Sequence, residues 1–249
     1  MADPPRWESR IASIAQCINS AEVPCVLWGH SLLNLHGVPS ILGSIDFVVP
    51  DESLAISSEY LSQLPFLESC ADQNCICSSP TRSTPGPASH YHLKGSEVTV
   101  GLYLQSETLW FLPPLDKKLS CPSRDTLSEH FVLASDKTVL PSWRPGRGPG
   151  VLQPAQGDLI VAPKSHVLLE AFIRMYARDE GTRAGAFGIA MLAYMEEYVE
   201  DDGYLDIEKL PIVLRRHYLE LKEGQKPVRQ WTRELKESLG IPYVEPDDD

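Results

Sequence analysis

Residues 26–50, which read VLWGHSLLNLHGVPSILGSIDFVVP, decide how this chain folds. The stretch predicts a strand, a tight turn at Gly29, a short helix over 31–35 and a second strand over 45–49. The second strand carries a carboxylate, Asp46, among apolar residues. A buried carboxylate needs a charged partner, a metal ion or an opening to solvent, because it is costly to bury alone. This stretch is therefore the candidate functional site.

The composition is that of a globular protein, with 249 residues of which 43% are hydrophobic and 22% charged. No apolar run reaches the roughly 20 residues of a membrane-spanning helix, and the N-terminal MADPPRWESR lacks the apolar core of a signal peptide. We therefore expect a cytoplasmic protein without a membrane partner. The formal net charge of -12 opposes nucleic-acid binding, which relies on Lys and Arg.

Three of the six cysteines, at positions 70, 75 and 77, lie close together in the segment ESCADQNCICSS. Their C-x4-C-x-C spacing is not that of common zinc sites, which use paired C-x2-C units or histidine partners. The histidines show no H-x3-H spacing either. The sequence thus predicts reduced thiols here. The segment 71–89 is rich in Ser, Thr, Pro and Gly and predicts an exposed loop.

The residue pattern changes from mixed to helical near position 160. Before it, alternating apolar residues predict strands, including short ones over 138–140 and 158–162. After it, apolar residues recur at helical spacing, and Pro163 suits a first helical position. We predict an α/β domain over 1–160, with a mixed sheet flanked by helices, and a C-terminal helical subdomain over 161–249.

Two partial motifs suggest other chemistry. Gly29-His30-Ser31 has half of the G-x-S-x-G motif of serine hydrolases, with a Leu in place of the second Gly. A serine hydrolase that uses Ser31 therefore stays open as an alternative. The segment Ala162-Pro163-Lys164-Ser165 ends like a Walker A loop, but Pro163 removes a phosphate-binding N–H.

The stretch LLNLHGVPSILGSID, residues 32–46, is similar to the phrase ALxLHGVPRxTxDID of the nucleotidyltransferase superfamily, which includes DNA polymerase β and tRNA nucleotidyltransferases. The resemblance covers about residues 20–105, and the Trp- and Tyr-rich tail looks like fungal members without an assigned activity. It implies a mixed sheet flanked by helices, a C-terminal helical bundle, and Mg²⁺ and a nucleoside triphosphate as cofactors. In that family a Gly turn approaches the triphosphate, and a D-x-D pair with a third carboxylate binds the metal ions.

Carried onto this sequence, the resemblance assigns Asp46 as the catalytic and metal-binding residue. It implies that the triphosphate is contacted by Gly29, His30, Ser31 and Lys164. Ser44 stands where the D-x-D pair has its first acid, and strand alternation places Ser44 and Asp46 on one face. The candidates for the third carboxylate are Glu97 and Asp158.

The missing acid at position 44 changes the predicted function. Two-metal phosphoryl transfer needs several carboxylates, because each Mg²⁺ takes hard oxygen ligands. We therefore predict a degenerate, non-catalytic nucleotidyltransferase-like protein that binds a nucleotide, a small molecule or a protein partner. The alternative is an active Mg²⁺-dependent nucleotidyltransferase that modifies a small molecule or a protein.

Overall fold

The computed structural model describes residues 7–70, 72, 75–79, 82, 84–123, 127–153 and 159–244. The chain divides into two compact units. One comprises residues 1–82 and 86–164, and the other comprises 83–85 and 165–249. The first unit is mixed α/β, and the secondary structure described in the second is entirely helical. No helix in the described part of the chain is long and apolar enough to cross a bilayer.

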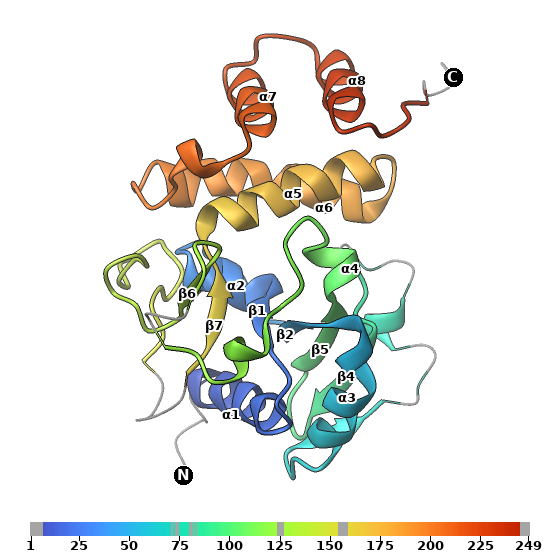
Figure 1. Ribbon diagram of the computed structural model, residues 1–249, viewed down its shortest axis with the longest axis vertical. Coiled ribbons are helices and arrows are strands. Elements are labelled where there is room, and N and C mark those ends of the chain that lie inside the picture. The colour runs from blue at the N-terminus through green and yellow to red at the C-terminus, as the bar shows by residue number, and fades with distance from the viewer. Residues whose placement is uncertain are drawn as a thin grey trace. The chain divides into compact units, whose positions relative to one another are not determined.

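The α/β unit is built on a five-stranded mixed sheet (Figure 1). Its strand order is β1-β2-β5-β4-β3, where β2 and β5 run parallel and all other neighbours are antiparallel. The strands are β1 (Val26–Trp28), β2 (Ser44–Val49), β3 (Leu67–Ser69), β4 (Ser89–Leu93) and β5 (Thr99–Leu104). The predicted mixed sheet with a C-terminal helical part is confirmed.

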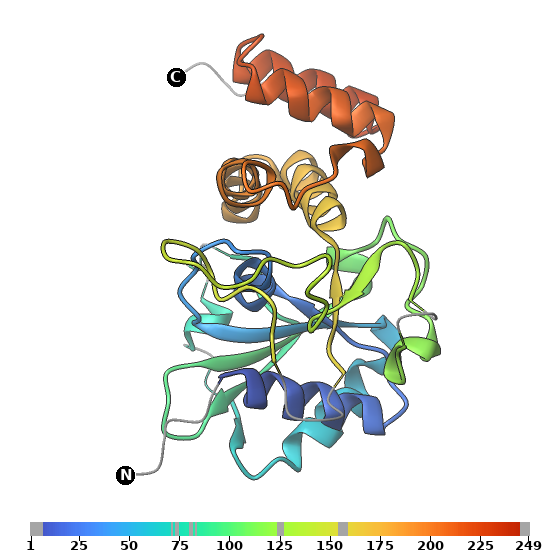
Figure 2. The ribbon, with the colours of Figure 1, turned by 90° about the vertical axis from the view of Figure 1, so that its left-hand side faces the viewer.

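Helices cover both faces of this sheet (Figure 2). Helices α1 (Trp7–Ser20) and α3 (Leu54–Ser62) lie on one face, and α2 (Gly29–Leu35) lies on the other. The apolar stripe of α1 is fully buried, as its helical spacing requires. The hydroxyl of Tyr91 on β4 donates a 2.7 Å hydrogen bond to the Ser58 carbonyl of α3, which fixes which way β4 faces.

The two faces of the sheet differ in chemistry. Residues in register on neighbouring strands point to the same side, so the face toward α1 and α3 collects apolar residues: Ile45, Phe47, Tyr91, Val100 and Leu102. The opposite face collects polar and small residues: Ser44, Asp46, His90, His92, Thr99 and Gly101. The candidate site lies on this second face.

A smaller antiparallel sheet is formed by β6 (Phe131–Leu133) and β7 (Val161–Pro163), with β7 beside β1. Two predictions were wrong in this region. Residues 138–140 form a turn instead of a strand, because the Asp136 carboxylate accepts the Thr138 backbone N–H at 2.9 Å. Pro163 ends β7 instead of opening a helix, and its carbonyl accepts a 2.9 Å hydrogen bond from His36.

Short helical turns complete the α/β unit: η1 (Asp51–Ser53), η2 (Ile76–Ser78), α4 (Gln105–Thr108) and η3 (Lys117–Ser120). The helical unit contains α5 (Ser165–Asp179), α6 (Arg183–Met195), η4 (Glu196–Glu200), η5 (Ile207–Lys209), α7 (Ile212–Lys222) and α8 (Val228–Ser238). Its core is aromatic. Tyr176 stacks on Trp231 at 5.6 Å between ring centroids, and the Trp231 indole donates to the His217 carbonyl at 2.8 Å.

Candidate functional site

The Gly29 turn brings the end of β1 against Asp46 of β2. Trp28 is the register partner of Asp46, and Gly29 follows with φ +61°, a conformation that L side chains rarely adopt. A Cβ at Gly29 would collide with Asp46 Oδ2. The open space of this glycine is therefore filled by a carboxylate of the same chain. The sequence resemblance implies that the backbone of this Gly turn approaches a phosphate.

A second glycine lies against the opposite side of the same carboxylate. Gly101 of β5 is the register partner of Asp46, and a Cβ placed on it would lie 2.5 Å from Asp46 Oδ1. Tyr103 and Pro87 would lie within 3.2 Å of that Cβ as well. The sequence signal for this role was available, because an isolated glycine inside a strand often marks a close approach. This role of Gly101 was not predicted from the sequence.

The Asp46 carboxylate is buried, with 2% of the residue exposed. Its Oδ2 accepts a 2.6 Å hydrogen bond from the Ser44 hydroxyl. Oδ1 faces the Gly101 backbone and makes no hydrogen bond of normal geometry with a described residue. Burial raises the pKa of Asp46 to about 6, against the opposing effects of the Ser44 hydroxyl and the Arg82 charge.

Arg82 is the cation that acts on this carboxylate. Its guanidinium donates to the Tyr103 hydroxyl at 3.3 Å, and its charge lowers the pKa values of Asp46 and, after the larger effect of burial, of His30. Arg82 belongs to the segment predicted to be an exposed loop. That prediction was wrong for the described residues of the segment that pack on the sheet, such as Cys77, whose thiol lies 3.4 Å from the Thr99 hydroxyl.

The other predicted phosphate-contacting residues have different surroundings. Ser31 is 3% exposed and donates to the Ser44 carbonyl at 3.4 Å, whereas a hydrolase exposes its nucleophilic serine, so the arrangement does not support a serine hydrolase. His30 is half-buried, with Nδ1 2.6 Å from the Ser40 hydroxyl. Lys164 follows β7, where its backbone N–H donates to the His130 carbonyl at 2.9 Å. The positive charge that acts on Asp46 comes from Arg82 instead of Lys164.

A third carboxylate does not join Asp46 in the described part of the chain. Glu97 is exposed in the turn before β5, and Asp158 lies outside the described residues. The only group of three or more potential metal ligands found among the described residues does not include Asp46. Mg²⁺ requires several oxygen ligands in near-octahedral geometry. A single buried carboxylate, hydrogen-bonded to Ser44 and subject to the charge of Arg82, does not fit this ion.

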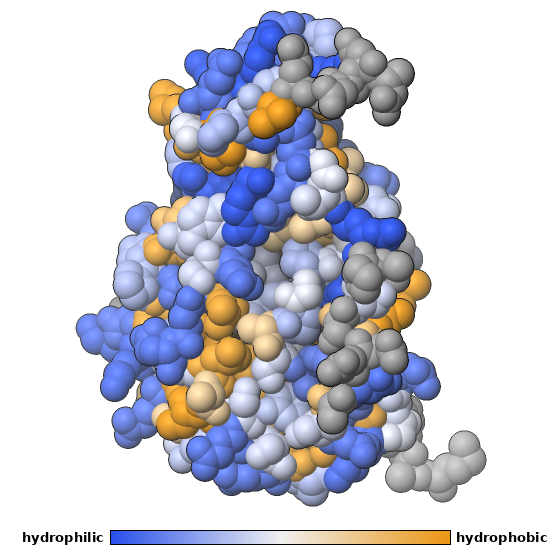
Figure 3. All heavy atoms as spheres, turned by 90° about the vertical axis from the view of Figure 1, so that its right-hand side faces the viewer, coloured by the Kyte–Doolittle hydropathy of each residue, from blue (hydrophilic) through white to orange (hydrophobic). Residues whose placement is uncertain are grey.

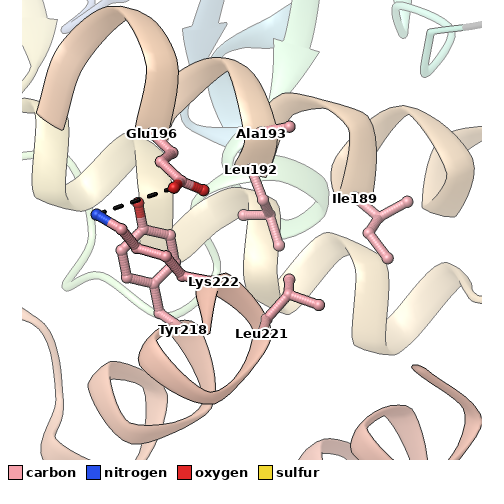
Figure 4. A pocket seen from close by; sticks show the side chains of 7 residues that line it. All are labelled: Ile189, Leu192, Ala193, Glu196, Tyr218, Leu221 and Lys222. Carbon is pink, nitrogen blue, oxygen red and sulfur yellow. Dashed lines mark ion pairs between the residues drawn. The ribbon is translucent and has the colours of Figure 1, made fainter. Parts of the chain in front are cut away.

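A concave surface lies within the helical unit, between α6 and α7 (Figure 4). Its apolar lining comes from Ile189, Leu192, Ala193 and Leu221. At one end Lys222 forms ion pairs with Glu200 at 3.0 Å and with Glu196 at 3.9 Å. The Tyr218 hydroxyl donates to Glu200 at 2.6 Å. Because these polar groups are paired with one another, the groove offers a ligand mainly apolar contacts.

Exposed hydrophobic side chains are distributed differently on the two units. Figure 3 shows a group of them on one face of the α/β unit, whereas on the helical unit they are scattered among polar residues. The exposed apolar residues of the helical unit include Tyr194, Ile212 and Val228. Scattered single residues of this kind are ordinary on protein surfaces and do not define a site.

Comparisons with known proteins provide one similarity. No protein-family model matches the chain, and no curated protein matches it. The structure is similar to the crystal structure of an antigenic nucleotidyltransferase-like protein from Paracoccidioides brasiliensis. That similarity covers 92% of each chain, at 12% sequence identity and a TM-score of 0.44. Values this low do not show a family.

Proposed function

We propose that this chain is a degenerate nucleotidyltransferase-like protein that does not transfer nucleotides and acts by binding. The order of strand, Gly turn, helix and Asp-bearing strand supports the scaffold: β1, Gly29, α2 and β2 follow one another as the sequence resemblance implies. The proposed ligand is a nucleotide, a small molecule or a protein partner, of which the geometry favours the last two.

One observation carries the non-catalytic proposal. Asp46 is enclosed between Gly29 and Gly101, where the Ser44 hydroxyl and the Arg82 charge partly offset the cost of burying its charge. Metal-dependent phosphoryl transfer needs acidic groups that are open to metal and substrate. Here the remaining acid is buried and has an internal cation in its neighbourhood. It therefore fills the space between β1, β2 and β5 and is not open to a metal ion or a substrate.

The same geometry argues against a nucleotide as the ligand. The backbone space at Gly29 is filled by Asp46 itself, so a phosphate has no room to approach the turn on that side. The groove between α6 and α7 is open and apolar, with its charges already paired. Such a surface suits an apolar small molecule or an apolar side chain of a partner.

The experiment compares wild type, Asp46→Asn and Glu52→Gln as full-length chains. Each is incubated with the four α-labelled ribonucleoside triphosphates and Mg²⁺ or Mn²⁺, and label transfer and pyrophosphate release are measured. Glu52 is an exposed acid in η1, so its variant controls for a general loss of negative charge. We expect no turnover by any of the three, and no ATP binding at millimolar concentration by calorimetry.

The alternative, an active Mg²⁺-dependent nucleotidyltransferase, makes the opposite prediction. Turnover by wild type and by Glu52→Gln that is abolished in Asp46→Asn would establish catalysis and overturn the proposal. Mg²⁺-dependent ATP binding without turnover, lost in Asp46→Asn, would keep the chain non-catalytic but make a nucleotide its ligand.

A further inference from the structure

Four soft metal-binding side chains meet on the polar face of the sheet, outside the Asp46 site. Cys70 directly follows β3, Cys75 directly precedes η2, and His90 and His92 lie on β4. Each offers one ligand atom, and the four atoms all lie within 4.8 Å of one another. The Cys75 sulfur and His92 Nε2 are 3.4 Å apart.

From this cluster we infer that Cys70, Cys75, His90 and His92 form a structural Zn²⁺ site. Two thiolates and two imidazoles are a standard ligand set for zinc in a closed tetrahedral site. With Zn–S bonds of about 2.3 Å and Zn–N bonds of about 2.0 Å, a tetrahedral ion places its ligand atoms roughly 3.3–3.8 Å apart. The Cys75–His92 distance lies in that range, and the remaining distances are close enough for small rotations of the side chains to complete the site.

The backbone holds both histidines toward the two cysteines. His90 and His92 are two residues apart on β4, so they project from the same face of the sheet. Tyr91 between them points to the opposite face, where its hydroxyl donates to the Ser58 carbonyl. A slip of β4 by one residue would turn the histidines toward α3 and this tyrosine toward the polar face, so the register of the sheet specifies their orientation.

An unsatisfied nitrogen in the cluster is independent support for a ligand. His90 Nε2 is buried and has no hydrogen-bond partner among the described residues. A buried polar atom without a partner is costly, and native structures rarely keep one without a reason. A bond from this nitrogen to a metal ion would remove the cost. The donors are sulfur and nitrogen, which favour Zn²⁺ over Mg²⁺ or Ca²⁺.

A metal here would act on the segment that covers the Asp46 site. Described residues of the chain between β3 and β4 lie over the sheet: Cys77 contacts Thr99, Arg82 contacts Tyr103, and Pro87 lies beside Gly101. Among the described residues of this segment, η2 is the one helical element. Joining its first residues to β4 through a metal reduces the chain entropy that must be lost when it folds.

The test measures metal in the full-length protein, purified with a reductant and without added zinc. We expect inductively coupled plasma mass spectrometry to find one zinc ion per chain. After removal by a chelator, added Co²⁺ should produce the visible absorption of a tetrahedral ion together with a thiolate-to-cobalt charge-transfer band. The Co²⁺ titration of wild type needs no variant, so misfolding of a variant cannot obscure it.

Variants then assign the ligands. The Cys75→Ser and His92→Gln variants should lose the bound zinc. With Co²⁺, they should also lose the thiolate-to-cobalt charge-transfer band or the absorption of a tetrahedral ion. Cys77→Ser is the matched control, since Cys77 lies in the same segment but bonds Thr99 instead of the cluster, and it should keep one zinc. Absence of both zinc and the Co²⁺ spectrum in reduced wild type would overturn the inference. Equal zinc content in Cys75→Ser, or a Cys70–Cys75 disulfide under reductant, would overturn it as well.

Discussion

Two polar sites lie side by side on one face of the same sheet, and they differ in which groups surround their buried polar atoms. Asp46 on β2, Gly101 on β5 and His90 on β4 are consecutive register partners. Around Asp46 there is one acid, one hydroxyl and one guanidinium, which only partly offset the cost of burying the carboxylate charge, since its pKa stays raised to about 6. Around His90 there are two thiols and two imidazoles, and a buried nitrogen remains without a partner. Each site keeps one buried polar atom without a hydrogen-bond partner among the described residues, Asp46 Oδ1 and His90 Nε2, but only the second of the two brings four potential metal ligands together.

The largest expected effect comes from adding the missing acid to the Asp46 site. Ser44→Asp would place a second carboxylate beside Asp46 at a position that is 3% exposed. We expect a loss of about 4 kcal/mol in the free energy of unfolding, because a buried charge is left without compensation. Urea denaturation measures it, and Ser44→Ala, which removes one hydrogen bond, should cost only about 1 kcal/mol. Recovery of the Ser44→Asp variant by millimolar Mg²⁺ would show that the site does accept a metal.

The next prediction tests whether glycine backbone lies in close contact with the Asp46 carboxylate. Gly101→Ala introduces a methyl group 2.5 Å from Asp46 Oδ1 and should cost about 3 kcal/mol of stability. Gly43→Ala is the control, since a Cβ there meets nothing within 4 Å, and it should be neutral. Adding Asp46→Ala to Gly101→Ala should recover part of the loss, which chemical denaturation of the double-mutant cycle measures. Equal losses in the two glycine variants would contradict the close approach.

Zinc that binds at the second site should stabilise the folded protein by mass action. When free zinc exceeds its dissociation constant about 100-fold, the free energy of unfolding should rise by about 2.7 kcal/mol. Thermal unfolding with and without a chelator reports this as a shift in Tm. The shift should vanish in Cys75→Ser and persist in Cys77→Ser. A shift of the same size in both variants would place the metal elsewhere.

The smallest effect is the pH dependence that Asp46 imposes. Its pKa is about 6 in the folded protein, above the ordinary aspartate value of 3.8, so the folded state binds the proton more tightly than the unfolded state. The stabilising contribution of the protonated form is therefore full below pH 4 and is lost as the pH rises through 6. Relative to Asp46→Asn, wild type should lose about 2 kcal/mol between pH 4 and pH 7. Parallel pH profiles for the two proteins would mean that Asp46 is not buried as described.

Local signals in the sequence predicted the local structure well. The strand, Gly turn and helix from β1 to α2, and the strand that carries Asp46, follow from apolar runs and turn chemistry over a few residues. The C-terminal helices follow from 3.6-residue periodicity, and α8 ends before Gly240 as its sequence indicates. The same reasoning failed where one long-range contact decided the outcome, as at Pro163, whose carbonyl accepts a hydrogen bond from His36.

The sequence by itself determined the scaffold and the position of its remaining acid. Only the tertiary structure decided what surrounds that acid, because Gly101 reaches Asp46 through strand register and Arg82 acts on it from a distant loop. The thiol–imidazole cluster has the same origin: β4 carries two histidines to cysteines that precede them by 15 or more residues. Periodicity and turn propensity are properties of neighbouring residues. Which strands pair, and in what register, is set by burial of the whole sheet.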